Sequence, residues 1–200
     1  MSILQQLSDK VAQYISKGPI DIVLAGGAAM FHHKMRNEIG DFDIYTDDMA
    51  LFNAWTREKA PDLDVTTHHN FWGQVTIGDA MKSPIVHLDE IVRIRCLAPI
   101  DLFIMKADAA RERDLEDLAL MVPMLDPMDI LERMAELKKF NAYGTWYLST
   151  ENLLAEIQLQ YGIPITKEHI AATKAEPADQ GVLMQAFGLE MQYKRKIGVV

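Results

Sequence analysis

Apolar and polar residues in the first hundred positions repeat with two periods, one typical of helices and one typical of strands. Residues 3–17 place apolar side chains at helical spacing before Gly18-Pro19, which predicts a first helix. Residues 20–25 form a short apolar run, which predicts a buried strand. The same reasoning predicts helices at 28–34 and 48–60 and strands at 42–45, 63–68, 71–77 and 91–97, with 63–68 and 71–77 close enough to form a hairpin. This order of elements is typical of an α/β protein.

Beyond Pro99 the pattern becomes helical. Apolar residues recur at helical spacing in segments 100–122, 127–140, 150–161, 166–174 and 178–191. No flexible linker separates the two halves of the chain, so the helices are expected to pack on the sheet. We therefore expect an α/β (α+β) fold with a small mixed-sheet core in residues 1–98 and a helical C-terminal region in residues 99–200.

Composition and charge narrow the classes of function. The chain has 200 residues, of which 49% are apolar, and a formal net charge of −9. Such a charge argues against a broad basic face that holds long nucleic acid. The single cysteine, Cys96, excludes an internal disulfide and suggests a reducing compartment. No apolar run reaches the roughly 18 residues of a membrane span, and the N-terminus lacks a signal-like apolar core, so we expect a cytoplasmic protein with no membrane partner.

The candidate chemistry begins where the first predicted strand ends. Gly26 and Gly27 follow that strand and precede a predicted helix, so backbone N–H groups of the turn can bind an anion such as phosphate. Asp41 and Asp43 stand two residues apart in the next predicted strand and therefore point to the same face. Two like charges on one face repel unless a cation lies between them. Carboxylates suit Mg²⁺ (or Mn²⁺), whose coordination substrate phosphates complete.

These residues resemble the signature of the polymerase-beta-type nucleotidyltransferase superfamily. That signature is a Gly-Gly or Gly-Ser pair, a spacer, and then acid-apolar-acid-apolar, here Asp41-Phe42-Asp43-Ile44. A second block, residues 97–118, is similar to the abortive-infection and toxin-antitoxin branch, in which a lysine is followed by a basic residue and Asp-x-x-Asp. The resemblance covers roughly residues 20 to 120, and it implies a nucleotidyltransferase core and a toxin-antitoxin or phage-defence setting.

The resemblance also implies roles for two basic residues. Lys106 matches the lysine that contacts the nucleotide triphosphate, although a snorkelling lysine on an amphipathic helix explains it equally well. Arg36 lies where related chains often carry a basic residue that meets a phosphate, with a surface arginine as the alternative. Asp114 and Asp117 lie three residues apart beside Arg111 and Arg113, so helical salt bridges explain them, with a site role for Asp114 as the alternative.

The superfamily usually adds a third carboxylate on a later strand. Asp64 follows the helix after the Asp pair and is the first candidate, and Asp79 is the second. A chain without a third acid is the remaining alternative. The adjacent histidine pairs, His32-His33 and His68-His69, do not suit chelation of one ion, because neighbouring side chains diverge on helices and strands.

We therefore expect an Mg²⁺-dependent nucleotidyltransferase that moves a nucleoside monophosphate from an NTP to a hydroxyl of an RNA or protein acceptor. Gly26, Gly27, Arg36 and Lys106 would bind the nucleotide, and Asp41, Asp43 and Asp64 would be the catalytic, metal-binding acids. The alternative is a catalytically weakened protein of the same fold that acts by binding, as a toxin-neutralising partner or a nucleotide sensor. The acidic charge suits a cognate protein partner better than a nucleic acid.

Overall fold

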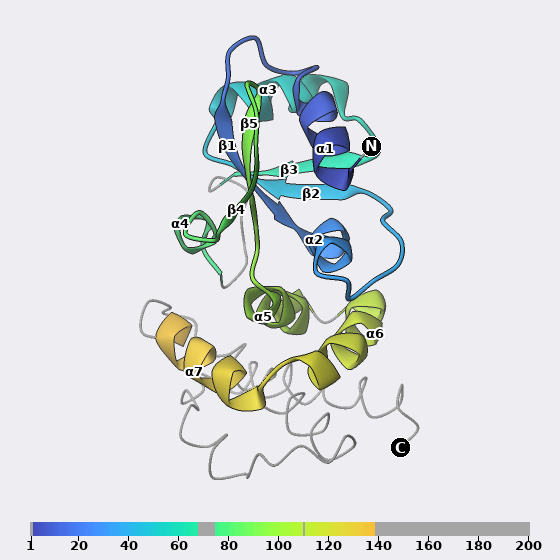
Figure 1. Cartoon of the computed structure of the whole chain (residues 1–200), viewed down its shortest axis with the longest axis vertical. Coiled ribbons are helices and arrows are strands. Elements are labelled where there is room, and N and C mark those ends of the chain that lie inside the picture. The colour runs from blue at the N-terminus through green and yellow to red at the C-terminus, as the bar shows by residue number, and fades with distance from the viewer. Residues whose placement is uncertain (1, 68–74, 110, 139–200) are drawn as a thin grey trace, which may run out of the picture. The chain divides into compact units, whose positions relative to one another are not determined.

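The computed structural model describes residues 2–67, 75–109 and 111–138, which belong to two compact units (Figure 1). The first unit spans Met1–Leu102 and the second Phe103–Val200. Because the division falls inside a helix, each unit is treated by itself. The helices expected beyond residue 140 lie outside the described residues.

The described part of the first unit contains a mixed sheet of five strands in the order β3-β2-β1-β5-β4. Central strand β1 pairs antiparallel with β2 and parallel with β5. Strand β3 pairs parallel with β2, and β4 pairs antiparallel with β5. The strand bounds are Ile20–Ala25 (β1), Phe42–Tyr45 (β2), Leu63–Thr66 (β3), Ile85–Leu88 (β4) and Val92–Cys96 (β5). This arrangement confirms the expected α+β fold with a mixed sheet.

Burial follows from the position of each strand. Residues 22–25 of β1 are all buried, as expected of a central strand covered on both faces. In β2, Phe42 and Ile44 are buried while Asp43 and Tyr45 are half-buried on the other face. The predicted alternation in β2 is therefore confirmed, and it places one acid of the Asp pair away from the core.

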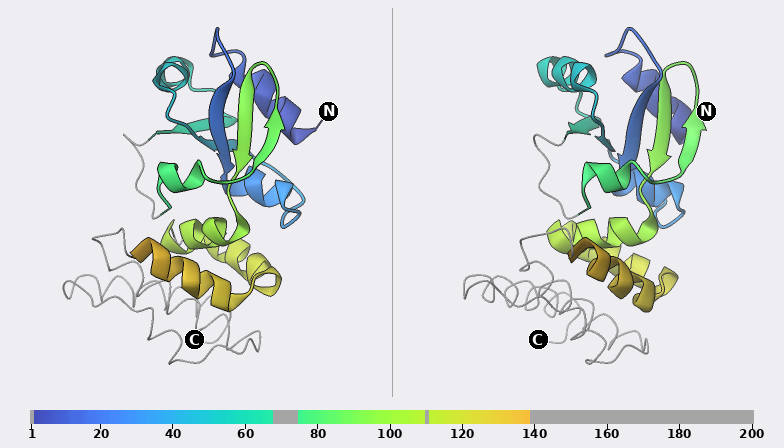
Figure 2. Two further views of the ribbon diagram at one scale, coloured as in Figure 1. Left: turned by 60° about the vertical axis from the view of Figure 1, so that its left-hand side comes forward. Right: turned by 90° about the vertical axis from the view of Figure 1, so that its left-hand side faces the viewer.

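Four helices lie in the described part of the first unit: α1 (Ile3–Val11), α2 (Gly26–His32), α3 (Met49–Glu58) and α4 (Ile77–Ala80). The Ser2 side chain caps α1 by accepting a hydrogen bond from the N–H of Gln5, and Asp48 caps α3 in the same way. Both views of Figure 2 show α1 and α3 on opposite sides of β1. Helix α2 packs against β1 and β2, so the turn before it stays close to both strands.

The structure corrects the sequence prediction at two places in this unit. Segment 71–77 is not a complete strand, because Ile77 begins α4, while residues 71–74 lie outside the described residues. Strand β3 pairs with β2, and most of the second arm of the expected hairpin lies outside the described residues. Strand β4 was not predicted, because its half-exposed residues show no clear alternation and pairing with β5 stabilises it.

The C-terminal helices are α5 (Pro99–Ala109), α6 (Glu112–Met121), the short 3-10 helix η1 (Val122–Met124) and α7 (Pro127–Lys138). The prediction of one helix over 100–122 is wrong, since α5 ends at Ala109 and α6 begins at Glu112, with Arg111 as its N-cap. The Asp114 carboxylate accepts a hydrogen bond from the backbone N–H of Arg111, which stabilises the new helix start. Among the described helices, none is long and apolar enough to cross a membrane.

Candidate functional site

The glycine turn and the second acid of the Asp pair lie in direct contact. Strand β1 ends at Ala25, and Gly26 then adopts a positive φ of 54°. A Cβ atom at Gly26 would lie 1.7 Å from Oδ2 of Asp43, so the carboxylate occupies the space that any other side chain would need. The strand register, which pairs Ala25 with Asp43, causes this approach. Glycine is therefore required at position 26 both for conformation and for space.

Arg36 lies on the same turn. A Cβ atom at Gly27 would lie 2.9 Å from Nη1 of Arg36, so the guanidinium group lies next to the Gly27 backbone. The two glycines thus have a carboxylate beside the first and a guanidinium beside the second. The structure thus brings Gly26, Gly27, Arg36 and Asp43 together, and their roles in binding a nucleotide or a metal ion stay predictions.

Asp64 lies next to Asp43 across the sheet. The parallel register pairs Asp43 with Asp64 directly, so the two side chains lie on one face of the sheet. Neighbouring strands of a sheet are about 4.8 Å apart. Asp64 is exposed, between the buried residues Leu63 and Val65. Of the two candidates for a third acid, Asp64 is thus the one placed beside the Asp pair.

Asp41 is exposed and immediately precedes β2. Within the part of the chain that the structure describes, the side chains of Asp41 and Asp64 have no hydrogen-bond or ion-pair partner. The described part of the chain contains no group of three His, Cys, Asp or Glu side chains placed to hold a metal ion. The donor chemistry of Asp41, Asp43 and Asp64 fits Mg²⁺, and their role as metal ligands stays a prediction.

Asp79 has a local structural role. It lies in α4, where its carboxylate accepts hydrogen bonds from the Thr76 hydroxyl at 2.9 Å and from Lys82 at 2.8 Å. The Thr76 hydroxyl in turn caps the helix by accepting from the N–H of Asp79 at 3.1 Å. These contacts explain Asp79 without a ligand.

Lys106 belongs to a buried ion cluster in the second unit. Its Nζ lies 2.6 Å from Asp117 and 3.2 Å from Asp114, and the three residues are 8%, 4% and 1% exposed. Arg111 adds a second cation, with Nε 2.6 Å from Asp114. Burial acts to raise the pKa of Asp114, but the hydrogen bond from Arg111 and the charge of Lys106 outweigh it and lower that pKa. The predicted salt bridge of Asp114 with Arg111 is confirmed, and Lys106 joins the cluster although the sequence did not show it.

The single cysteine is not an activated nucleophile. Burial raises the pKa of Cys96 to about 12, so its thiol is protonated near neutral pH. His33 Nε2 lies 3.4 Å from the sulfur but also 2.9 Å from the carbonyl oxygen of Leu97. Because a carbonyl can only accept, this ring nitrogen carries a proton and donates it. The pair therefore lacks a base that could remove the thiol proton.

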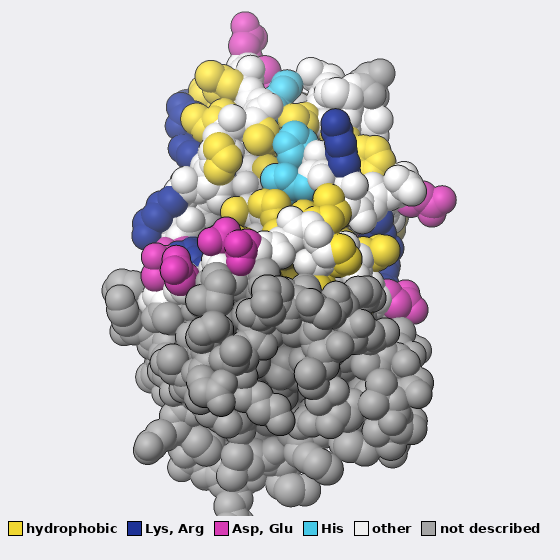
Figure 3. Space-filling view, turned by 60° about the horizontal axis from the view of Figure 1, so that its bottom comes forward, with side chains coloured by type: hydrophobic (Ala, Val, Ile, Leu, Met, Phe, Trp, Pro, Cys, Tyr) yellow, Lys and Arg dark blue, Asp and Glu magenta, His cyan; other side chains and the backbone are white. Residues whose placement is uncertain are grey.

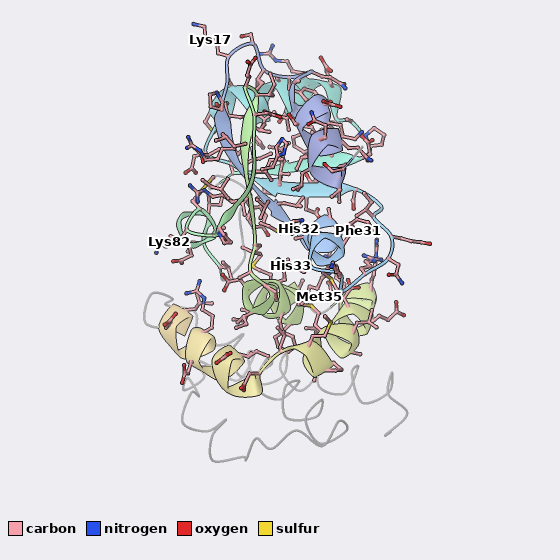
Figure 4. All side chains as sticks on the ribbon, viewed as in Figure 1. Lys17, Phe31, His32, His33, Met35 and Lys82 are labelled. Atoms are coloured by element: carbon pink, nitrogen blue, oxygen red, sulfur yellow. The ribbon has the colours of Figure 1, made fainter. Side chains whose placement is uncertain are left out.

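A cavity lined by Arg36 was not predicted. It has a volume of about 390 Å³ and is lined by Ile3, Phe31, His32, Lys34, Arg36 and Asn37. Figure 4 labels Phe31, His32, His33 and Met35 around the C-terminal end of α2, and Figure 3 shows histidine side chains among hydrophobic ones. The sequence signal was the basic run at Lys34 and Arg36 immediately after a predicted helix.

A larger cavity, of about 560 Å³, lies at the start of β1, away from the glycines at its end. Its charged side chains are partly paired, although Asp21 Oδ1 and Arg95 Nε are buried without a hydrogen-bond partner among the described residues. Asp21 lies 2.9 Å from Arg93 and 3.6 Å from Arg95, and Asp48 caps α3. We therefore place the candidate site at the glycine turn, where carboxylates and a guanidinium lie beside the backbone, rather than at the larger cavity.

No protein-family model, curated protein or solved structure matches the chain. The resemblance to the nucleotidyltransferase superfamily therefore stays a prediction from the sequence motifs.

Proposed function

We propose that this chain is a nucleotidyltransferase that moves a nucleoside monophosphate from an NTP to a hydroxyl of an RNA or protein acceptor. The observation that carries the proposal is the contact of Asp43 with Gly26, together with Asp64 at the paired position of the next strand. A glycine turn beside in-register carboxylates is the geometry that bound phosphates and their counter-cation require.

Each group has a defined role in this proposal. The backbone of Gly26 and Gly27 approaches the phosphates, and the Arg36 guanidinium neutralises part of their charge. Asp41, Asp43 and Asp64 form no three-ligand metal site by themselves among the described residues, so they would hold Mg²⁺ or Mn²⁺ together with the substrate phosphates, and the ion would stabilise charge at the reacting phosphorus and activate the attacking hydroxyl. The acceptor hydroxyl loses its proton to solvent, its oxygen forms a bond to the α-phosphorus, the bond between that phosphorus and the oxygen bridging to the β-phosphate breaks, and pyrophosphate leaves. A cytoplasmic toxin-antitoxin or phage-defence setting, with a cognate protein partner, follows from the resemblance of residues 97–118 and belongs to the same proposal.

The test is transfer of labelled NMP from each of the four NTPs to cellular RNA and protein in the presence of Mg²⁺. Wild type should label an acceptor, and Asp43→Asn and Asp64→Asn should each lose transfer while their melting temperatures stay within a few degrees of wild type. Asp9→Asn is the control, because Asp9 is an exposed aspartate of α1. Full transfer by both site variants would assign these acids a structural role.

Ligand-induced stabilisation separates an enzyme from a binding protein. At a hundredfold excess of NTP·Mg²⁺ over its Kd, wild type should gain about 2.7 kcal/mol of unfolding free energy. A melting shift without transfer to any acceptor would support the alternative, a nucleotide sensor or toxin-neutralising partner. If wild type shows neither a melting shift with NTP·Mg²⁺ nor transfer to an acceptor, the proposed nucleotide-binding site is wrong.

A further inference from the structure

The cavity beside Arg36 is built by the way α2 ends. His33 is the C-cap, Lys34 follows with φ of 61°, and the N–H groups of Lys34 and Met35 bond to the carbonyls of Phe31 and Met30 at 3.0 and 2.9 Å. This pair of hydrogen bonds is a Schellman motif, which reverses the chain after a helix. Met35 is buried and anchors the reversal. The turn therefore places Lys34 and Arg36 beside the last residues of the helix.

The lining combines positive charge with an apolar surface. Lys34 and Arg36 are cations, His32 and Asn37 add polar nitrogen groups, and Phe31 and Ile3 supply apolar surface. The cavity lining contains no carboxylate, although the chain carries a net charge of −9. A region of this sign in an acidic protein favours an anionic ligand.

His32 contributes hydrogen bonding rather than charge to this cavity. Burial, and then the neighbouring charge of His33, lower its pKa, so its imidazole is mostly neutral near pH 7. A neutral ring can either donate or accept a hydrogen bond, whereas Lys34 supplies a fixed charge.

The size and chemistry of the cavity indicate one class of ligand. A volume of about 390 Å³ lies at the lower end of the range of small-molecule pockets, roughly 300 to 1,000 Å³. Cations bind a phosphate, and an aromatic ring provides a stacking surface for a base, which is the combination used by proteins that bind single-stranded nucleic acid.

We propose that this cavity is a second nucleotide pocket, which binds a nucleoside phosphate with Lys34 on the phosphate and Phe31 against the base. Only the role of the pocket in NMP transfer rests on the proposed function. Arg36 lines the cavity and its guanidinium also lies next to Gly27, so a nucleotide bound in the cavity is adjacent to the glycine turn. The ligand is either the terminal nucleotide of an RNA acceptor or a free nucleotide.

Lys34 offers a clean test because the chain contains a matched control. Lys34 and Lys59 both adopt positive φ at a helix C-terminus, at 61° and 46°, and Lys59 does not line the cavity. Glycine suits that conformation, so Lys34→Gly and Lys59→Gly make the same change of charge and backbone, and both should keep or raise the melting temperature.

The experiment measures binding of three probes in buffer with EDTA: a fluorescent eight-nucleotide single-stranded RNA, AMP and inorganic phosphate. Wild type should bind the RNA or AMP, Lys34→Gly should weaken that binding at least tenfold, and Lys59→Gly should bind like wild type. The slope of log K against log salt for RNA should become less negative by about 0.7 in Lys34→Gly, because one phosphate contact is lost. Phe31→Leu should weaken binding of the nucleoside probes but not of phosphate.

The probes separate the two sources of ligand. Tight binding of RNA with weak binding of AMP identifies an acceptor strand, and the reverse identifies a free nucleotide. Equal affinity for AMP and inorganic phosphate would overturn the nucleoside part of the inference, and equal binding by Lys34→Gly and wild type, or no binding of RNA and AMP, would overturn it entirely. Asp43→Asn should keep this metal-free binding, so loss of NMP transfer in that variant does not contradict the second nucleotide pocket. Conversely, failure of RNA and AMP to bind in EDTA would contradict the pocket but not the proposed NMP transfer.

Discussion

Two groups of aspartates in this molecule differ in their burial and in the charges around them. In the first unit, Asp41 and Asp64 are exposed, and Asp43 lies against a glycine turn. In the second unit, Asp114 and Asp117 are buried, and their charge is compensated by Lys106 and Arg111. Both groups belong to motifs that the superfamily resemblance singled out.

The difference indicates which group can act on a ligand. A buried carboxylate that is paired with two cations has already exchanged water for protein partners, so a ligand would have to displace them. The exposed carboxylates of Asp41 and Asp64 keep water that a metal ion can replace. The four predictions that follow break or sharpen this contrast.

The largest effect is expected for Lys106→Met, which removes the shared cation of the buried cluster. It removes the cation that lies 2.6 Å from the buried Asp117 and one of the two cations beside Asp114, so the free energy of unfolding should fall by about 3 kcal/mol. Urea denaturation measures this loss. Unchanged stability combined with weaker NTP·Mg²⁺ binding would instead support the triphosphate contact that the resemblance implies.

A smaller effect is expected for Gly26→Ala, because the new Cβ would overlap the Asp43 carboxylate in a backbone conformation that alanine resists. The cost should be about 2 kcal/mol, and NTP·Mg²⁺ should no longer raise the melting temperature. Gly78→Ala is the matched control: its Cβ would meet its nearest neighbour, Thr76, at 3.8 Å inside α4. That change should raise stability or leave it unaltered, so a similar loss in both variants would remove the special role of Gly26.

The buried cluster should also make stability depend on acid pH. The pKa of Asp114 is lowered in the folded chain, so its stabilising contribution is complete above the unfolded value, about 3.9, and is lost as pH falls from there through the folded value. Between pH 6 and pH 3, Asp114→Asn should lose about 1 kcal/mol less stability than wild type. Asp129→Asn, at an exposed position of α7, should follow the wild-type pH profile in the same denaturation series.

The smallest effect is expected for Asp79→Asn. Asp79 contacts Thr76 and Lys82 at the surface of α4, so stability should fall by about 0.5 kcal/mol and NMP transfer should persist. Transfer lost in Asp79→Asn but retained in Asp64→Asn would reverse the order of the two candidate acids.

Local pattern was sufficient for much of the fold and of the candidate site. The apolar run 20–25 could form little else than a buried strand, and alternation in residues 42–45 placed Asp43 on the face opposite Phe42. Gly26 was identified because a strand-turn-helix junction needs glycine. These features depend on neighbours within a few residues.

Features that depend on distant neighbours were missed. Strand β4 has half-exposed residues and exists through its pairing with β5. The break between α5 and α6 contains neither proline nor glycine, and it is stabilised by the Asp114 carboxylate on the Arg111 N–H. The cavity beside Arg36 needs Ile3 from α1 and Phe31 from α2, whose proximity no local pattern shows.

The parallel pairing of β1 with β5 has a consequence for biosynthesis. Ile20 pairs with Val92, so 72 residues must follow before the partner strand exists, a delay of roughly 4 to 14 s at ribosomal speeds of about 5 to 20 residues per second. During that interval β1 can pair with β2, but its other edge exposes the backbone of the most apolar strand in the sheet. Open apolar edges template association between chains. The emerging polypeptide is therefore most prone to aggregation before Val92–Cys96 leaves the ribosome, and chains that terminate in this window should require chaperones.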